Sequence, residues 1–189
     1  MVEQAREELQ STGSLSLPTR KKLWLALGEV KKNADYAERT VGLQKRVKLA
    51  TECVKRVLNI WDAGIGEDMS LVPLLSAVDK YLTGKISVEQ LEQILNHYRQ
   101  IVEEVSYSAE DERCGVVGLA ACYVANIAQY DEVLFEVTDS EDLDEELDSF
   151  TWDTSYLISL LYSEEERAEY WSWYLQRIEE AYVEYSQKH

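Results

Sequence analysis

Residues that interrupt helices are scarce in this chain. Its 189 residues include only eight glycines and two prolines, whereas turn-rich β proteins need both residue types at frequent intervals. Apolar side chains recur instead at spacings of three and four, which is the period of one helix face. Because 46% of the residues are hydrophobic, the chain has enough apolar side chains to bury a sizeable core. We therefore predict an all-α bundle of seven or eight helices, with no strand of any length.

The most regular helix pattern covers residues 40–62, where lysines and arginines are expected on the solvated flanks of one apolar stripe. Ser87 with Gln90, and Ser163 with Glu166, have the spacing of capping boxes. These signals and the apolar periodicity predict further helices near residues 1–10, 19–32, 70–83, 87–105, 108–130, 151–162 and from 163 almost to the end.

The segment 108–130 is rich in small residues, including Gly115 and Gly118. A glycine inside a helix costs about 1 kcal/mol relative to alanine, so its presence there suggests close backbone contact with neighbours. We predict that this segment is the central helix of the bundle. The length of the chain fits one helical domain over residues 1–189.

Charge is distributed unevenly along the chain. The net charge is −17, and residues 131–189 hold 18 acidic and three basic side chains. Residues 20–56 hold 11 basic and four acidic side chains, and we interpret them as a solvated helix flank partly paired with the acidic third. Because like charges at high density resist helix formation and burial, we predict an acidic loop or weak turn at 131–150.

The composition argues against several classes of function. A strongly negative surface repels nucleic acid and anionic membranes and favours encounter with basic proteins. The N-terminus lacks the apolar region of a signal peptide, and no apolar run reaches the roughly 20 residues that span a bilayer. We expect a cytoplasmic protein without cofactor or metal, and three cysteines that act as small buried residues (Cys53, Cys114 and Cys122).

One alternative is a magnesium-dependent all-α hydrolase. Glu166 and Glu169 form an E-x-x-E pair, but magnesium prefers an octahedron of oxygen ligands, which needs a second carboxylate pair on a facing helix. The spacing of Glu103 and Glu104 does not identify them as that pair. No phosphate-binding loop or nucleophile elbow is present. Another alternative is an acidic helical adaptor or regulator.

Two segments together resemble a known family. The first is residues 46–58, which read RVKLATECVKRVL and are followed by Trp61 and Asp62; the second, residues 152–174, begins WDTSYLISLLY and ends EEERAEYWSWYL. Both resemble the fifth predicted family of helical immunity proteins in bacterial polymorphic toxin systems. The resemblance implies a cytoplasmic inhibitor that binds a cognate toxin protein and blocks it without catalysis.

The resemblance supplies no binding motif, so a binding site has to be argued from charge and side-chain type. Toxins that cut nucleic acid present basic clefts, which an inhibitor can occupy with carboxylates. Tryptophan is favoured as an anchor at protein interfaces, although completing the core is an alternative role for the aromatic residues near the C-terminus. We predict that the partner-binding residues are Asp139, Glu141, Asp142, Asp144, Glu145, Glu146, Asp148, Trp152 and Trp173.

Overall fold

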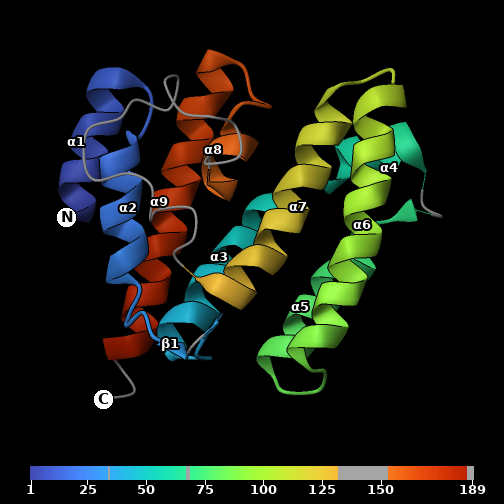
Figure 1. The fold of residues 1–189 in the computed structure, drawn as a ribbon. Coiled ribbons are helices and arrows are strands. Elements are labelled where there is room, and N and C mark those ends of the chain that lie inside the picture. The colour runs from blue at the N-terminus through green and yellow to red at the C-terminus, as the bar shows by residue number, and fades with distance from the viewer. Residues whose placement is uncertain (34, 67–68, 132–152, 187–189) are drawn as a thin grey trace.

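The computed structural model describes residues 1–33, 35–66, 69–131 and 153–186. Within these ranges the chain forms nine helices and one two-stranded sheet, which confirms the predicted all-α bundle (Figure 1). The helices are α1 (Val2–Thr12), α2 (Leu17–Ala26), α3 (Val41–Lys55), α4 (Leu58–Ile65), α5 (Val72–Leu82), α6 (Val88–Ser108), α7 (Arg113–Tyr130), α8 (Thr154–Ser159) and α9 (Glu164–Ser186).

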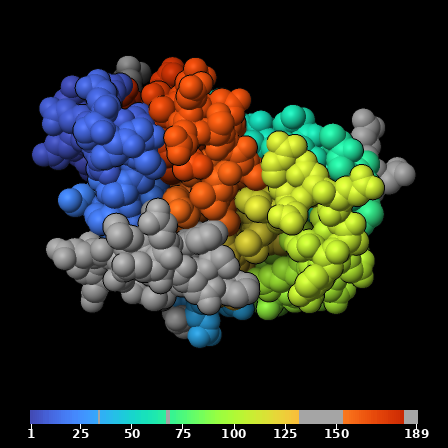
Figure 2. Space-filling view, turned by 90° about the horizontal axis from the view of Figure 1, so that it is seen from above, coloured from blue at the N-terminus to red at the C-terminus, as the bar shows by residue number. Residues whose placement is uncertain are grey.

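The helices are arranged around a central pair. Helices α3 and α7 pack against each other in the middle of the bundle, and α4, α5 and α6 cover α7 on one side. On the other side α9 packs against α1 and α3, and the short helix α8 lies between α9 and the central pair. Seen from above, α1 and α2 lie beside α8 and α9, at the opposite side of the molecule from α4 and α6 (Figure 2).

Helix α7 is the centre of the bundle, as its small residues predicted. It contacts α3, α4, α5, α6 and α8. A Cβ atom placed on Gly118 would lie 2.6 Å from side-chain atoms of both Trp61 and Val102, and one on Gly115 would lie 2.8 Å from Ser106 Oγ. Real side chains do not approach this closely, so the glycines are what allow α4 and α6 to pack against α7.

The predicted helix over residues 40–62 is two helices. Helix α3 ends at Lys55 and α4 begins at Leu58, which is why the described residues contain one helix more than the upper expected number. The break occurs at Val57, whose backbone has φ −122° and ψ 7°. No glycine or proline marks this position. The turn brings Trp61, which is fully buried, onto Gly118, so tertiary packing rather than a local signal sets the break.

The predicted helix over residues 19–32 is shorter than expected. Helix α2 ends at Ala26, and the chain then turns at Gly28, which has φ +142°. A Cβ atom there would lie 2.9 Å from the Cα atom of Gly42, so only glycine fits both the conformation and the space.

Beyond this turn, the expectation of no strand is wrong: β1 (Lys32–Asn33) pairs antiparallel with β2 (Tyr36–Ala37). Two-residue strands are too short to show a period-two pattern.

Candidate partner-binding surfaces

Most of the predicted partner-binding residues lie outside the described part of the chain. Residues 132–152 contain nine acidic and no basic side chains, and Asp139, Glu141, Asp142, Asp144, Glu145, Glu146, Asp148 and Trp152 all belong to this segment. The two residues that flank it, Asp131 and Asp153, are described, and both are buried. Each is fixed by a buried arginine.

Asp131 ends α7 in an unusual conformation and binds Arg46. Its φ is +60° and its ψ is −93°, which lies outside the left-handed helical region where aspartate is commonly found at positive φ. The Arg46 guanidinium, fully buried, donates from Nε to Oδ1 at 2.6 Å and from Nη2 to Oδ2 at 2.7 Å. Further bonds go to the carbonyl oxygens of Gly28 at 2.8 Å and Glu29 at 3.1 Å. These bonds provide the pairing that a buried charge requires.

Asp153 has two structural roles at the other end of the segment. Its Oδ1 atom caps α8 by accepting from the backbone N–H of Tyr156 at 3.0 Å and from the Ser155 hydroxyl. Its Oδ2 atom accepts from Arg20 Nε at 2.8 Å. Arg20 is also fully buried and donates from Nη1 to the carbonyl oxygen of Leu15 at 2.7 Å. This ion pair joins α2 to the start of α8.

Two arginines correct part of the interpretation of the basic region as a solvated helix flank, whereas their ion pairs with Asp153 and Asp131 confirm that the region is partly paired with the acidic third. The two are Arg20 and Arg46. Both side chains are inside the protein. A signal for Arg46 was present in the sequence: it follows Leu43 by three positions and precedes Ala50 by four, which places it within the apolar stripe of α3. The pattern did not indicate its partner, because Asp131 is 85 positions away in the chain.

Trp173 is the one predicted partner-binding residue that the structure describes. It lies half-buried on α9. The guanidinium carbon of Arg56 lies 4.5 Å from the centre of its ring, and that of Arg177 lies 5.9 Å away. Arg56 is exposed on the neighbouring end of α3. The indole is therefore part of the surface between α3 and α9, where cation–π contacts hold its ring.

The other aromatic residues of this part of α9 belong to the core. Tyr170, Trp171 and Tyr174 are at most 1% exposed, and the Tyr170 hydroxyl donates to the carbonyl oxygen of Ser155 at 2.9 Å. Desolvation raises the pKa of Tyr170 and of Tyr174 above the ordinary tyrosine value. Of the aromatic residues in this part of α9, Trp173 therefore lies at the surface, and Tyr170, Trp171 and Tyr174 belong to the core.

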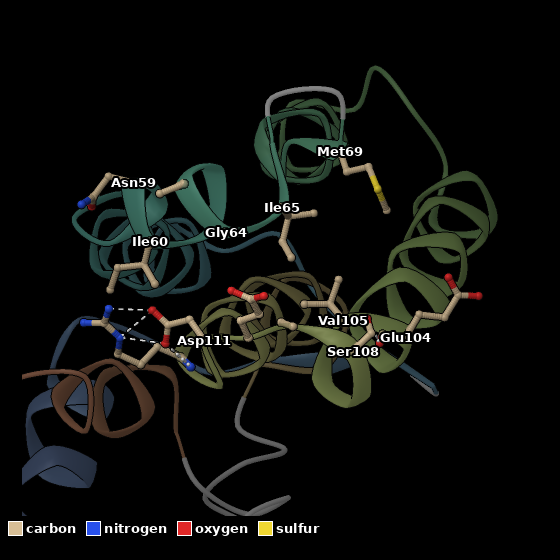
Figure 3. Close-up of a pocket in the computed structure, with 13 residues that line it drawn as sticks. Asn59, Ile60, Gly64, Ile65, Met69, Glu104, Val105, Ser108 and Asp111 are labelled. Carbon is tan, nitrogen blue, oxygen red and sulfur yellow. Dashed lines mark hydrogen bonds and ion pairs between the residues drawn. The ribbon is translucent and has the colours of Figure 1, made fainter.

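A hollow of about 810 Å³ opens between α4 and the corner where α6 leads into α7. Figure 3 shows Ile65 of α4 and Val105 of α6 pointing toward one another across it. Val105 is buried, Ile65 is half-buried, and Met69 at one edge is 38% exposed. We call this feature the α4–α6 hollow; it has an apolar floor and a size within the range of protein ligand sites.

Carboxylates form the rim of the α4–α6 hollow. Glu104 and Glu110 line it and are exposed. Asp111, on the opposite side from Glu104 in Figure 3, binds Arg113 through Oδ2 and Nη2 at 2.6 Å and through Oδ1 and Nε at 2.9 Å. These hydrogen bonds from Arg113 lower the pKa of Asp111. The arginine is thus neutralised by its neighbour, and the rim is acidic.

Glu166, one of the two glutamates considered as a magnesium site, caps a helix instead. Glu166 Oε2 accepts from the Ser163 backbone N–H at 3.1 Å and from its Oγ at 2.7 Å, which confirms the predicted capping box of α9. The hydrogen bonds from Ser163 lower the pKa of Glu166. Among the described residues, no group of three or more His, Cys, Asp or Glu side chains is placed to hold a metal ion.

The three cysteines are buried and form no disulfide. Desolvation raises the pKa of Cys53 and of Cys122 to about 12, and it raises the pKa of Cys114 as well. At neutral pH these thiols hold their protons and are poor nucleophiles. Their role is that of small apolar side chains in the core, as expected.

In the part of the chain that the structure describes, no helix is both long and apolar enough to cross a membrane.

No protein of curated function is significantly similar to this chain. The family model described as Immunity protein Imm5 matches residues 2–180, which include every helix from α1 to α8 and most of α9. This chain belongs to the Imm5 family of immunity proteins.

Proposed function

We propose that this chain is the immunity protein of a polymorphic toxin system, and that it binds a cognate toxin protein in the cytoplasm and neutralises it. The observation that carries the proposal is the family match over residues 2–180. It acts as one helical domain, by occupying the toxin rather than by catalysis. Two kinds of side chain that serve as catalytic groups in other proteins have structural roles here: Glu166 caps a helix, and the three cysteines are buried, with raised thiol pKa values.

The binding surface that we propose is the acidic segment between Asp131 and Asp153, together with Trp173. Nine carboxylates and no cations in residues 132–152 make this segment complementary to a basic partner surface. Such complementarity accelerates encounter toward about 10⁸–10⁹ M⁻¹s⁻¹ at low salt. Aromatic anchors then slow release, a role that we assign to Trp152 and Trp173.

The buried flanking pairs support this proposal. Asp131 is fixed by Arg46 and Asp153 by Arg20, so both attachment points of the acidic segment belong to the rigid helical body. Fixing the ends of a binding segment lowers the conformational entropy that is lost when it docks. The same buried carboxylates are already paired and are not available to a partner.

The test is whether this chain protects bacteria that express the gene immediately upstream of its own, which is where we expect the toxin to be encoded. We expect full protection by the natural chain. Protection should be lost, and toxin binding weakened, when Asp139, Glu141, Asp142, Asp144, Glu145, Glu146 and Asp148 are replaced by Asn or Gln. The matched control exchanges Asp for Glu and Glu for Asp at the same seven positions, which retains the charge.

The results separate the function from its site. If the natural chain neither binds the toxin nor protects against it, the proposed function is wrong. If it protects and the seven amide substitutions leave protection and salt dependence of binding unchanged, the acidic segment is not the site. A Trp173→Ala variant with an unchanged dissociation rate would remove Trp173 from the interface.

A further inference from the structure

The proposed function uses the acidic segment and Trp173, and it leaves the α4–α6 hollow without a role. It is lined by residues of α4, α6 and the start of α7. These elements lie on the far side of the bundle from α1 and α2 (Figure 1). Tyr107, which precedes the lining residue Ser108 on α6 but does not itself line the hollow, is 87% exposed, although tyrosine normally buries much of its ring. Exposed aromatic side chains are enriched at protein interfaces.

The floor and the rim of the hollow have different chemistry. Ile60, Ile65, Val105 and Ala109 supply apolar surface below the opening. At the rim, neither Glu104 nor Glu110 forms an ion pair or hydrogen bond through its carboxylate with any side chain that the structure describes. The Asp111 carboxylate is bound by Arg113. An apolar floor beneath uncompensated carboxylates complements a group with an apolar stem and a cationic head.

We infer that the α4–α6 hollow receives a lysine or arginine side chain of the toxin. The methylene stem packs between Ile65 and Val105, and the cationic head lies at the acidic rim to which Glu104 and Glu110 contribute. Long cationic side chains bury their stems along apolar surface in this way, and arginine is enriched among the residues that dominate binding energy. The inference rests on the proposed function and adds a second contact to the acidic segment.

Two other kinds of occupant fit the hollow less well. A phosphate or other anion would meet the free carboxylates, because the one cationic group among the lining residues, Arg113, is already paired with Asp111. A metal ion would need more ligands than the described side chains bring together. A second copy of this chain is the remaining possibility, and the test includes it.

The experiment compares two double substitutions at the same corner of the molecule. E104Q/E110Q removes the rim carboxylates, and E103Q/E112Q removes two exposed carboxylates that lie within two positions of them in the sequence but do not line the hollow. Binding of the toxin domain that the protection assay identifies is measured by surface plasmon resonance, with melting temperatures to confirm folding. We expect E104Q/E110Q to raise the Kd roughly 30-fold, mainly through faster dissociation.

The control variant E103Q/E112Q should change the Kd less than about threefold. That change should come from a slower association rate, seen at low salt. Equal effects of the two variants would overturn the inference, because they would show a general dependence on charge. A second variant, Ala63→Trp, fills the hollow from the exposed face of α4 and retains both carboxylates. It should weaken binding, whereas Gln93→Trp on exposed α6 surface should not. Tight binding by Ala63→Trp would also overturn the inference.

The outcomes distinguish this inference from the proposed function. If the natural chain protects against the toxin and E104Q/E110Q binds it as tightly as E103Q/E112Q does, the inference is wrong and the function stands. If the natural chain does not bind the toxin, both are wrong. Sedimentation of the chain alone tests the remaining occupant. A dimer that E104Q/E110Q dissociates would assign the hollow to a second copy and overturn the inference.

Discussion

The Arg46 guanidinium and the Asp131 carboxylate form a bidentate ion pair, with N–O distances of 2.6 and 2.7 Å, and both side chains are 0% exposed. The pair joins α3 to the end of α7. Arg46 also donates to the backbone turn that contains Gly28. One side chain therefore connects two central helices and the loop after α2.

Replacing Arg46 should be strongly destabilising. Arg46→Met removes the bidentate cationic partner of the buried Asp131 carboxylate, and the expected loss is about 3–5 kcal/mol in the free energy of unfolding. Arg46→Lys should lose less but still destabilise, because a lysine cannot form the bidentate pair. Urea denaturation measures both. Lys48→Met on the exposed face of α3 is the control and should change stability by less than about 0.5 kcal/mol.

The Arg20–Asp153 pair can be separated from the helix cap that Asp153 also forms. Asp153→Asn retains a good capping residue but removes the carboxylate that pairs with the buried Arg20 guanidinium, so it should cost about 3–5 kcal/mol. Removing the charge as well, in Arg20→Met/Asp153→Asn, should restore a large part of this loss. Thermal unfolding of the single and double variants gives the comparison. Strictly additive losses would show that the two charges do not interact.

A methyl group at Gly118 should disturb the packing of three helices. Alanine is a better helix former than glycine by about 1 kcal/mol, yet its Cβ would lie 2.6 Å from Trp61 and Val102. We expect overpacking to prevail, with a net destabilisation of about 1–3 kcal/mol. Val102→Ala should cost less in the Gly118→Ala background than in the natural chain, because it relieves one collision. A gain in stability from Gly118→Ala alone would contradict this account.

Stability should decrease at alkaline pH. Burial raises the pKa of Cys53 and of Cys122 to about 12, whereas an exposed thiol in the unfolded chain titrates near about 8.5. Above that pH the unfolded state releases protons that the folded state retains, so unfolding becomes more favourable as pH rises toward 12. Each thiol contributes a slope of about 1.4 kcal/mol per pH unit. Urea denaturation between pH 8 and 11 measures the slope, and Cys122→Ala should reduce it.

The periodicity of apolar residues was sufficient to predict the class of fold and the central position of α7. Helix formation depends on neighbours three and four positions apart, so a stripe of side chains and a run of small residues can be read along the chain. The capping boxes at Ser87 and Ser163 were predictable for the same reason, and the structure contains both. The Imm5 family was recognisable from the helix patterns at 46–58 and 152–174, and the match over residues 2–180 confirms it.

Only the tertiary structure decided which charged side chains are buried with the core and where the surface forms a hollow. Arg20 finds its partner 133 positions away and Arg46 finds its partner 85 positions away, and no local pattern encodes such distances. The break at Val57 and the α4–α6 hollow likewise arise where separate helices meet. Local sequence therefore determined the helices, because each forms from interactions within a few residues. The pairing of buried charges and the shape of the surface required the packed chain, because they depend on contacts between segments far apart in sequence.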